Sequence, residues 1–203
     1  MARYHRKRDF GVTPEPAGDQ TGVPLAGLPG FVVQKHDASR LHYDFRLEAG
    51  GVLKSWAVPK GPSLDPAHKR LAVRTEDHPL DYADFEGLIP EGQYGGGTVM
   101  VWDRGTYHNL SSEKGRPIAV ERAVEKGHVK VWLQGSKLEG AWSLVRTSRG
   151  EPGKEQWLLI KADDPGADRT TDITESHPRS VVTERTIEEI AAAPESRVWQ
   201  SNR

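Results

Sequence analysis

The sequence predicts an all-β-dominated fold, an antiparallel sandwich or barrel, on two observations. From residue 31 onwards, short runs rich in β-branched and aromatic residues follow one another, with turn-forming residues between them. In one of these runs, residues 41–48, apolar and polar residues alternate with the period of a strand. At 203 residues the chain can bury one core but is short for two ordinary domains. We therefore expect one domain with flexible ends.

Residues 1–30 precede these runs and are rich in proline, glycine and small polar residues, as in GVTPEPAG and VPLAGLPG. This composition predicts an extended, flexible N-terminal arm with little regular structure. The first eight residues contain no acidic residue and four basic ones: Arg3, Arg6, Lys7 and Arg8. Such a cluster either lies against phosphates or forms a solvated tail, and the overall net charge of −1 does not decide between the two.

The expected strands are residues 31–34, 41–48, 52–58, 70–75, 98–102, 128–135, 141–147 and 156–161. The clearest hairpin joins 41–48 to 52–58 through Ala49, Gly50 and Gly51, because glycine readily supplies the positive φ angles of a tight turn.

Beyond the last strand, residues 162–182 are polar and interrupted by proline and glycine, which predicts a long surface loop or partly disordered linker. A short C-terminal helix follows. Thr186 and Glu189 have the spacing of a capping box, and Ile187 and Ile190 form an apolar pair at helical spacing.

The composition restricts the chemistry. There is no cysteine, so any metal must bind to histidine, carboxylate or other oxygen ligands, and a reducing compartment is favoured. The N-terminus lacks the apolar core of a signal peptide, and no apolar run approaches the roughly 18 residues of a membrane span. We expect a soluble, cytoplasmic protein with no membrane partner.

One predicted strand carries an unusual polar face. Because side chains alternate along a strand, residues 41–48 place His42, Asp44, Arg46 and Glu48 on one face and Leu41, Tyr43, Phe45 and Leu47 towards the core. Solvated strand faces are usually built from lysine, threonine, serine and glutamate. A row containing histidine, aspartate and arginine is therefore a candidate functional surface.

His36 stands six residues before His42, and a tight connection between them would bring the two imidazoles together. Two imidazoles and the carboxylate of Asp44 form a mixed nitrogen and oxygen site that suits manganese, zinc or iron better than magnesium or calcium. Arg46 would then hold a phosphate next to the cation. The alternative is a set of polar residues that satisfy one another on a sheet face.

A second candidate is His78, in the sequence Glu-Asp-His-Pro-Leu-Asp-Tyr over residues 76–82. Pro79 places it at a strand end or turn, where catalytic histidines are common, although an ordinary loop histidine fits as well. The glycine-rich segment EGQYGGGT, residues 91–98, lacks the Gly-Lys-Ser/Thr ending of a phosphate-binding loop and leads into a strand, so we interpret it as a turn.

The stretch FVVQKHDASRLHYDFRLEAGGVLKSWAVPKGPSLDPAHKRLAVRTEDHPLDYADFEGLIPEGQYGGGTVMVWDRGTY closely resembles the 3′-phosphoesterase domain of bacterial DNA ligase D, and the resemblance extends from about Asp9 to near Glu189. It implies a β-barrel core and a manganese-dependent enzyme of end-joining repair, with Zn²⁺ or Co²⁺ as other possible ions. Such an enzyme removes a 3′-terminal ribonucleoside to leave a 3′-phosphate, and then removes that phosphate from the DNA or DNA–RNA primer–template.

By position, the resemblance implies metal ligands at His36, His42 and Asp44, residues around the scissile phosphate at Arg46, Arg70, His78 and Tyr82, and further active-site residues at Arg8, Asp9, Glu15 and Gln34.

The expected organisation is an arm over residues 1–30 that contributes to the active site, a barrel core over 31–161, and a loop with a C-terminal helix of the same domain over 162–203. No Lys-x-Asp-Gly ligase motif occurs. We therefore expect a free-standing relative that acts with separate ligase, polymerase and Ku-type proteins. Two alternatives are a non-catalytic DNA-end-binding module and a metal-dependent phosphatase of small metabolites.

Overall fold

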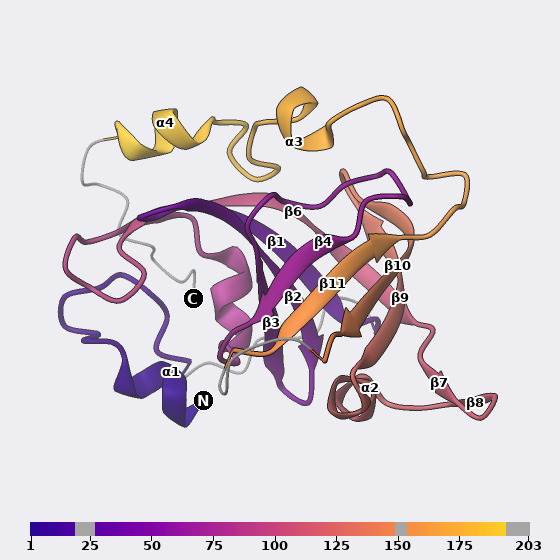
Figure 1. Cartoon of the computed structure of the whole chain (residues 1–203). Helices are drawn as coiled ribbons and strands as arrows, with labels where there is room; N and C mark the ends of the chain where they lie inside the picture. The colour runs from indigo at the N-terminus through magenta and orange to yellow at the C-terminus, as the bar shows by residue number, and fades with distance from the viewer. Residues whose placement is uncertain (19–26, 149–153, 194–203) are drawn as a thin grey trace.

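The fold is a closed barrel of eight antiparallel strands, seen in a computed structural model that describes residues 1–18, 27–148 and 154–193 (Figure 1). The strands pair in the order β1, β2, β3, β4, β11, β10, β9 and β6, and β6 pairs again with β1. Their bounds are β1 Gly30–Asp37, β2 Leu41–Ala49, β3 Val52–Val58, β4 Arg70–Arg74, β6 Gly97–Asn109, β9 His128–Gly135, β10 Glu139–Arg146 and β11 Gln156–Lys161.

Each of the eight predicted runs is one of these strands, and the sandwich alternative is excluded because the sheet closes on itself. Closure depends on β6, which pairs with β1 along most of its length and with β9 from Gly105 onwards. A Cβ atom at Gly105 would lie 2.0 Å from the carbonyl oxygen of Gln134. A glycine is therefore required where β6 passes from one partner to the other.

Shorter elements complete the described chain. Strand β5 (Gly87–Ile89) pairs with the first residues of β6, and β7 (Ser112–Glu113) pairs with β8 (Arg116–Pro117). The helices are α1 (Ala2–Arg6), the 3-10 helix η1 (Leu80–Asp84), α2 (Val120–Lys126), α3 (Ile173–Ser176) and α4 (Ile187–Ala191). In Figure 1, α3 and α4 lie at one end of the barrel and α2 at the other. No helix in these ranges is long and apolar enough to cross a membrane.

The barrel interior is built around buried indole rings. Trp56 and Trp157 contact edge to face at 5.6 Å between ring centroids, and Trp102 and Trp142 are also almost fully buried in this core. The predicted hairpin between β2 and β3 is confirmed, because Gly50 and Gly51 both adopt the left-handed conformation, with φ values of 60° and 73°.

The N-terminal arm has more structure than its composition predicts. Residues 2–6 form α1, and Tyr4 is fully buried in a second apolar cluster with Leu53, Tyr82 and Phe85, outside the barrel core. The hydroxyl of Tyr4 donates to the carbonyl oxygen of Pro16 at 2.6 Å. One buried aromatic residue in a polar segment produces no hydrophobic periodicity, so this packing could not be predicted from the sequence. Residues 19–26 of the arm lie outside the described residues.

The segment after β11 also packs more closely than a surface loop or disordered linker, because it contains α3 and buries Ile173 in the barrel core. The capping box of α4 is confirmed: Thr186 accepts from the backbone of Glu189, and Glu189 accepts from the backbone of Thr186. Ile187 and Ile190 pack into the core as their spacing predicts. Residues 194–203 lie outside the described part.

Candidate active site

The pairing register of β1 with β2 brings the predicted site residues together. His36 is the direct partner of His42, and Gln34 is the direct partner of Asp44, so these side chains project from the same face of the sheet. The alternation predicted for β2 is present: Tyr43, Phe45 and Leu47 point into the barrel core. Leu41 is the exception, since it begins the strand and is 46% exposed instead of facing the core. The polar face is on the outside of the barrel, beneath the N-terminal arm.

Three side chains on this face form a group that can hold a metal ion. The Nδ1 atom of His36 and the Nε2 atom of His42 each lie 3.7 Å from Oδ2 of Asp44. One potential ligand atom from each residue lies within 4.8 Å of the others. Ligands bind a transition metal at about 2.0–2.2 Å, which places neighbouring ligand atoms roughly 2.8–3.6 Å apart, from octahedral to tetrahedral geometry. The observed spacing is close to that requirement.

Backbone carbonyls orient both imidazoles. His36 donates from Nε2 to the carbonyl oxygen of Gly95 at 2.8 Å, and His42 donates from Nδ1 to the carbonyl oxygen of Arg40 at 2.8 Å. Because a carbonyl only accepts, each of these nitrogens carries the proton and the opposite nitrogen keeps its lone pair. Those opposite nitrogens are the two that face Asp44. Such carbonyl partners are the usual outer support of metal-binding histidines.

Asp44 is ionised in this arrangement. Burial acts to raise the pKa of its carboxyl group, but the charge of Arg46 holds the pKa well below its usual range. The site therefore presents two nitrogen ligands and one carboxylate, the combination that suits a transition-metal ion.

Arg46 lies next to this group and is 2% exposed. Its guanidinium donates from Nη2 to Asp44 at 3.1 Å and from Nε to the side-chain oxygen of Gln34 at 2.8 Å. Gln34 in turn donates to the carbonyl oxygens of Tyr82 and Phe85, both at 2.9 Å. The guanidinium is thereby fixed in one orientation, 5.0 Å from the centre of the Tyr82 ring.

His78 lies at the other side of Arg46. Its Nδ1 atom is 3.0 Å from Nη1 of Arg46 and 2.9 Å from the carbonyl oxygen of Glu76, and one nitrogen cannot both accept from the first and donate to the second. Burial, followed by the charges of Arg46 and Arg8, lowers the pKa of His78 well below its usual value. The ring is therefore neutral. The guanidinium only donates and the carbonyl only accepts, so the tautomer protonated on Nε2 satisfies the contact to Arg46 and the tautomer protonated on Nδ1 satisfies the contact to Glu76.

The N-terminal arm contributes a second buried arginine. Arg8 donates to Glu15 at 2.7 Å and to Glu76 at 3.3 Å, and only 4% of its side chain is exposed. Glu15 also accepts from the hydroxyl of Tyr82 at 3.1 Å. Burial, followed by the charge of Glu15, raises the pKa of Tyr82 well above its usual value, so this hydroxyl stays protonated. The arm, η1 and β2 thus share one polar network.

Two residues suggested by the family resemblance have other partners in the structure. Asp9 accepts from the backbone of Gly11 at 3.0 Å and stabilises a turn of the arm. Arg70 and Ala72 face the same side of β4, and Ala72 lies in the barrel core. The outer face of β4 carries Val73, which is aligned with Asp44 through Ala57 of β3. The structure therefore does not bring Arg70 into the network, and its charge helps to lower the pKa of Asp172 instead, after the hydrogen bond from Thr174.

Sequence reasoning assigned no role to several residues of the network. Glu76 is 8% exposed and joins the arm to the site through Lys7, at 2.9 Å, and Arg8. The one indication in the sequence was its position two residues before His78. Ser55 faces His78 from β3, with its hydroxyl 3.4 Å from Nδ1, and nothing in the local sequence distinguishes it.

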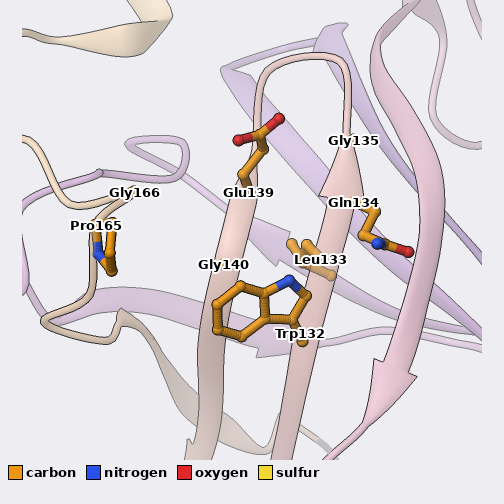
Figure 2. A pocket seen from close by; sticks show the side chains of 8 residues that line it. All are labelled: Trp132, Leu133, Gln134, Gly135, Glu139, Gly140, Pro165 and Gly166. Carbon is orange, nitrogen blue, oxygen red and sulfur yellow. The ribbon is translucent and has the colours of Figure 1, made fainter.

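A separate hollow of about 460 Å³ lies on another part of the surface, between β9, β10 and the segment after β11 (Figure 2). It is lined by Trp132, Leu133, Gln134, Gly135, Glu139, Gly140, Pro165 and Gly166. None of these belongs to the histidine and aspartate group or to the arginine network, so this hollow is not the candidate active site.

A comparison with known protein families finds a match over the part of the chain that holds most of the site residues. The family described as "DNA Ligase D 3'-phosphoesterase domain" matches residues 34–146, which include the group that can hold a metal ion, Arg46, His78 and Tyr82. The chain is 56% identical over 191 residues to the multifunctional non-homologous end joining protein LigD of Pseudomonas aeruginosa, covering 92% of this chain and 22% of that protein.

Similar relatives occur in mycobacteria. The corresponding protein of Mycobacterium tuberculosis is 47% identical over 78% of this chain and 19% of its own length, and that of Mycolicibacterium smegmatis is 42% identical over 81% and 21%. The chain thus spans about a fifth of the length of the relatives that it matches. Since the family match covers more than half of its residues, the chain belongs to the DNA ligase D 3′-phosphoesterase domain family.

Proposed function

We propose that this protein is a manganese-dependent phosphoesterase that heals the 3′ ends of DNA during break repair. It removes a 3′-terminal ribonucleoside as a phosphodiesterase and then the remaining 3′-phosphate as a phosphomonoesterase. The single observation that carries this proposal is the pair of imidazoles, each with its free nitrogen directed at Asp44 and with Arg46 beside them. Membership of the family supports it.

The residues present fit a divalent transition metal. His36, His42 and Asp44 would hold it, leaving other coordination positions for water and for a phosphoryl oxygen, an arrangement that suits Mn²⁺ and also accommodates Zn²⁺ or Co²⁺. When bound, such an ion polarises the phosphoryl oxygen and lowers the pKa of a bound water. Magnesium is disfavoured because it prefers oxygen ligands throughout.

The protein's own side chains supply the rest of the chemistry. Arg46, held by Gln34 and Asp44, offsets negative charge that develops on the phosphoryl oxygens. His78, which is neutral, donates a hydrogen bond from Nε2 to the phosphate or to the leaving oxygen in the tautomer that accepts from Arg46. Arg8 adds a second cation, whose position is fixed by Glu15 and Glu76. These roles fit a substrate with a concentrated negative charge.

A nucleic-acid end is a better fit than a small metabolite. The docked arm places α1 beside the site, and α1 carries the exposed cations Arg3 and Arg6. Such residues attract a polyanion and would have no function towards a small phosphorylated compound. The relatives are named as multifunctional end-joining proteins, and this chain matches a fifth of them. We propose that it acts in end joining together with ligase, polymerase and Ku-type proteins.

The test uses a 5′-labelled primer–template whose primer ends in one ribonucleotide, incubated with manganese, with magnesium or after exhaustive chelation. Manganese should produce a 3′-phosphate end and then a 3′-hydroxyl end. Asp44→Asn should abolish both products, whereas Asp163→Asn, a matched change at a carboxylate that is 70% exposed, should preserve them.

Full activity after chelation, or in Asp44→Asn, would contradict the proposal. Metal-independent binding of the primer–template without any product would favour the end-binding module. Turnover of p-nitrophenyl phosphate that excess primer–template does not inhibit would favour the small-metabolite phosphatase.

A further inference from the structure

The glycine-rich segment between β5 and β6, which we interpreted from its sequence as a turn, contacts the candidate active site at two points. The carbonyl oxygen of Gly95 accepts the hydrogen bond from Nε2 of His36 at 2.8 Å. The neighbouring Tyr94 contacts the arm, since its hydroxyl lies 2.8 Å from the ammonium of Lys7. The segment thus forms the edge of the site between a metal-binding residue and the arm.

Tyr94 is unusual among the aromatic residues of this region. Tyr4 and Tyr82 are buried, whereas Tyr94 is 48% exposed although it is adjacent to the residue that supports His36. Its ring lies 4.0 Å from the ammonium of Lys7 and 5.5 Å from the guanidinium carbon of Arg8. An exposed aromatic ring beside two cations combines the two features by which proteins bind single-stranded nucleic acid, stacking on a base and attraction to its phosphate.

We propose that Tyr94 is a specificity-determining residue, whose ring stacks on a nucleobase next to the scissile phosphate. The inference rests on the proposed function and names the part of the substrate that this edge of the site recognises. The alternative is that Tyr94 only fixes the arm to the glycine-rich segment through Lys7. The two roles differ in what they require: stacking needs the ring, and fixing the arm needs the hydroxyl and the ammonium.

The experiment compares three variants of the full chain. Stacking predicts that Tyr94→Phe retains the wild-type KM for a ribonucleotide-ended primer–template and that Tyr94→Leu raises it roughly 5- to 100-fold, the equivalent of one base stacked on an aromatic ring. Lys7→Met, which removes the partner of the hydroxyl but leaves the ring, should change KM much less than Tyr94→Leu does. Equal losses in Tyr94→Phe, Tyr94→Leu and Lys7→Met would overturn the inference.

A substrate series gives a second, independent readout. The wild type and Tyr94→Leu are assayed on primers that lack a base at the terminal ribose or at the preceding deoxyribose. If Tyr94 stacks on one of those bases, removing that base should raise the KM of the wild type and have little further effect on the variant. Additive losses at both positions would overturn the inference.

The wild type is measured first, because failure there has a different meaning. If it shows no metal-dependent cleavage of any end, the proposed function is wrong. If it cleaves normally and Tyr94→Leu has an unchanged KM on every substrate, the proposed function stands and the stacking role is wrong. Thermal unfolding of each variant, compared with the wild type, separates loss of recognition from loss of fold.

Discussion

His36 and His42 face each other as direct partners across β1 and β2, with their ring centroids 4.8 Å apart, and the nitrogen that each leaves unprotonated points at Asp44. The backbone carbonyls of Gly95 and Arg40 hold the two rings in these orientations. These hydrogen bonds restrict the rotation of both rings, which reduces the conformational entropy that the binding of an ion would cost.

The first prediction concerns Arg46, which makes contacts with Asp44, Gln34 and His78 at once. A lysine has one ammonium on a flexible stem and cannot replace a planar group with several fixed donors. Arg46→Lys should lower kcat by about 10²- to 10³-fold, the usual loss for one preorganised donor to a developing charge. Steady-state kinetics at saturating manganese measure this, with Arg104→Lys, at an exposed ion pair, as the control. A loss of only a few-fold in Arg46→Lys would show that charge alone is sufficient.

The second prediction concerns pH and stability. Burial and the charges of Arg46 and Arg8, only partly offset by Asp44, depress the pKa of His78 in the folded protein. Above pH 6.5, about the pKa of histidine in the unfolded chain, the ring is neutral in both the folded and the unfolded protein, and His78 makes its full contribution to the free energy of unfolding. Below that pH the unfolded chain binds a proton before the folded protein does, so the free energy of unfolding falls. In His78→Gln the slope of the unfolding free energy against pH should be smaller than in the wild type, by up to about 1.4 kcal/mol per pH unit. Urea unfolding between pH 7.5 and 5.5 measures both slopes, and equal slopes would contradict the burial of a neutral His78.

Strand parity and local spacing were sufficient to predict the barrel strands, the hairpin at Gly50 and Gly51, and the shared face of His42 and Asp44. Contacts between residues distant in sequence were not predictable in the same way. Arg8 and Glu76 are 68 positions apart, and their pairing depends on how the arm docks. The arm itself looked unstructured because its anchor is one tyrosine in a polar segment.

Arg70 illustrates a different limit. The family resemblance implied a residue near the phosphate, but Arg70 lies two residues before Ala72 in β4 and so faces the same side of the strand, towards the barrel interior. Which face of a strand points inwards depends on its pairing with strands distant in the sequence, and a single run such as residues 70–75 does not show this pairing. Its role in the reaction stays a prediction from the family resemblance.

The third prediction concerns the arm. Tyr4 packs edge to face against His78 at 5.1 Å and against Tyr82 at 6.1 Å between ring centroids, which ties the arm to the site. Tyr4→Ala should reduce the packing free energy that holds the arm by about 3–5 kcal/mol, so that residues 1–18 detach from the site while the barrel stays folded. Tyr4→Phe, which loses only the hydrogen bond to Pro16, should cost about 1 kcal/mol. Amide hydrogen exchange of the arm measures both effects, and unchanged protection in Tyr4→Ala would mean that other contacts hold the arm.

The most direct test of the metal centre is pulsed electron paramagnetic resonance of the manganese-loaded protein, which detects histidine nitrogens bound to the ion. The wild type should show two bound imidazole nitrogens, and His42→Gln should show one. His128→Gln, at an exposed histidine of β9 outside the site, should still show two. Absence of any bound nitrogen in the wild type, or two in both His36→Gln and His42→Gln, would contradict a metal centre built on His36, His42 and Asp44.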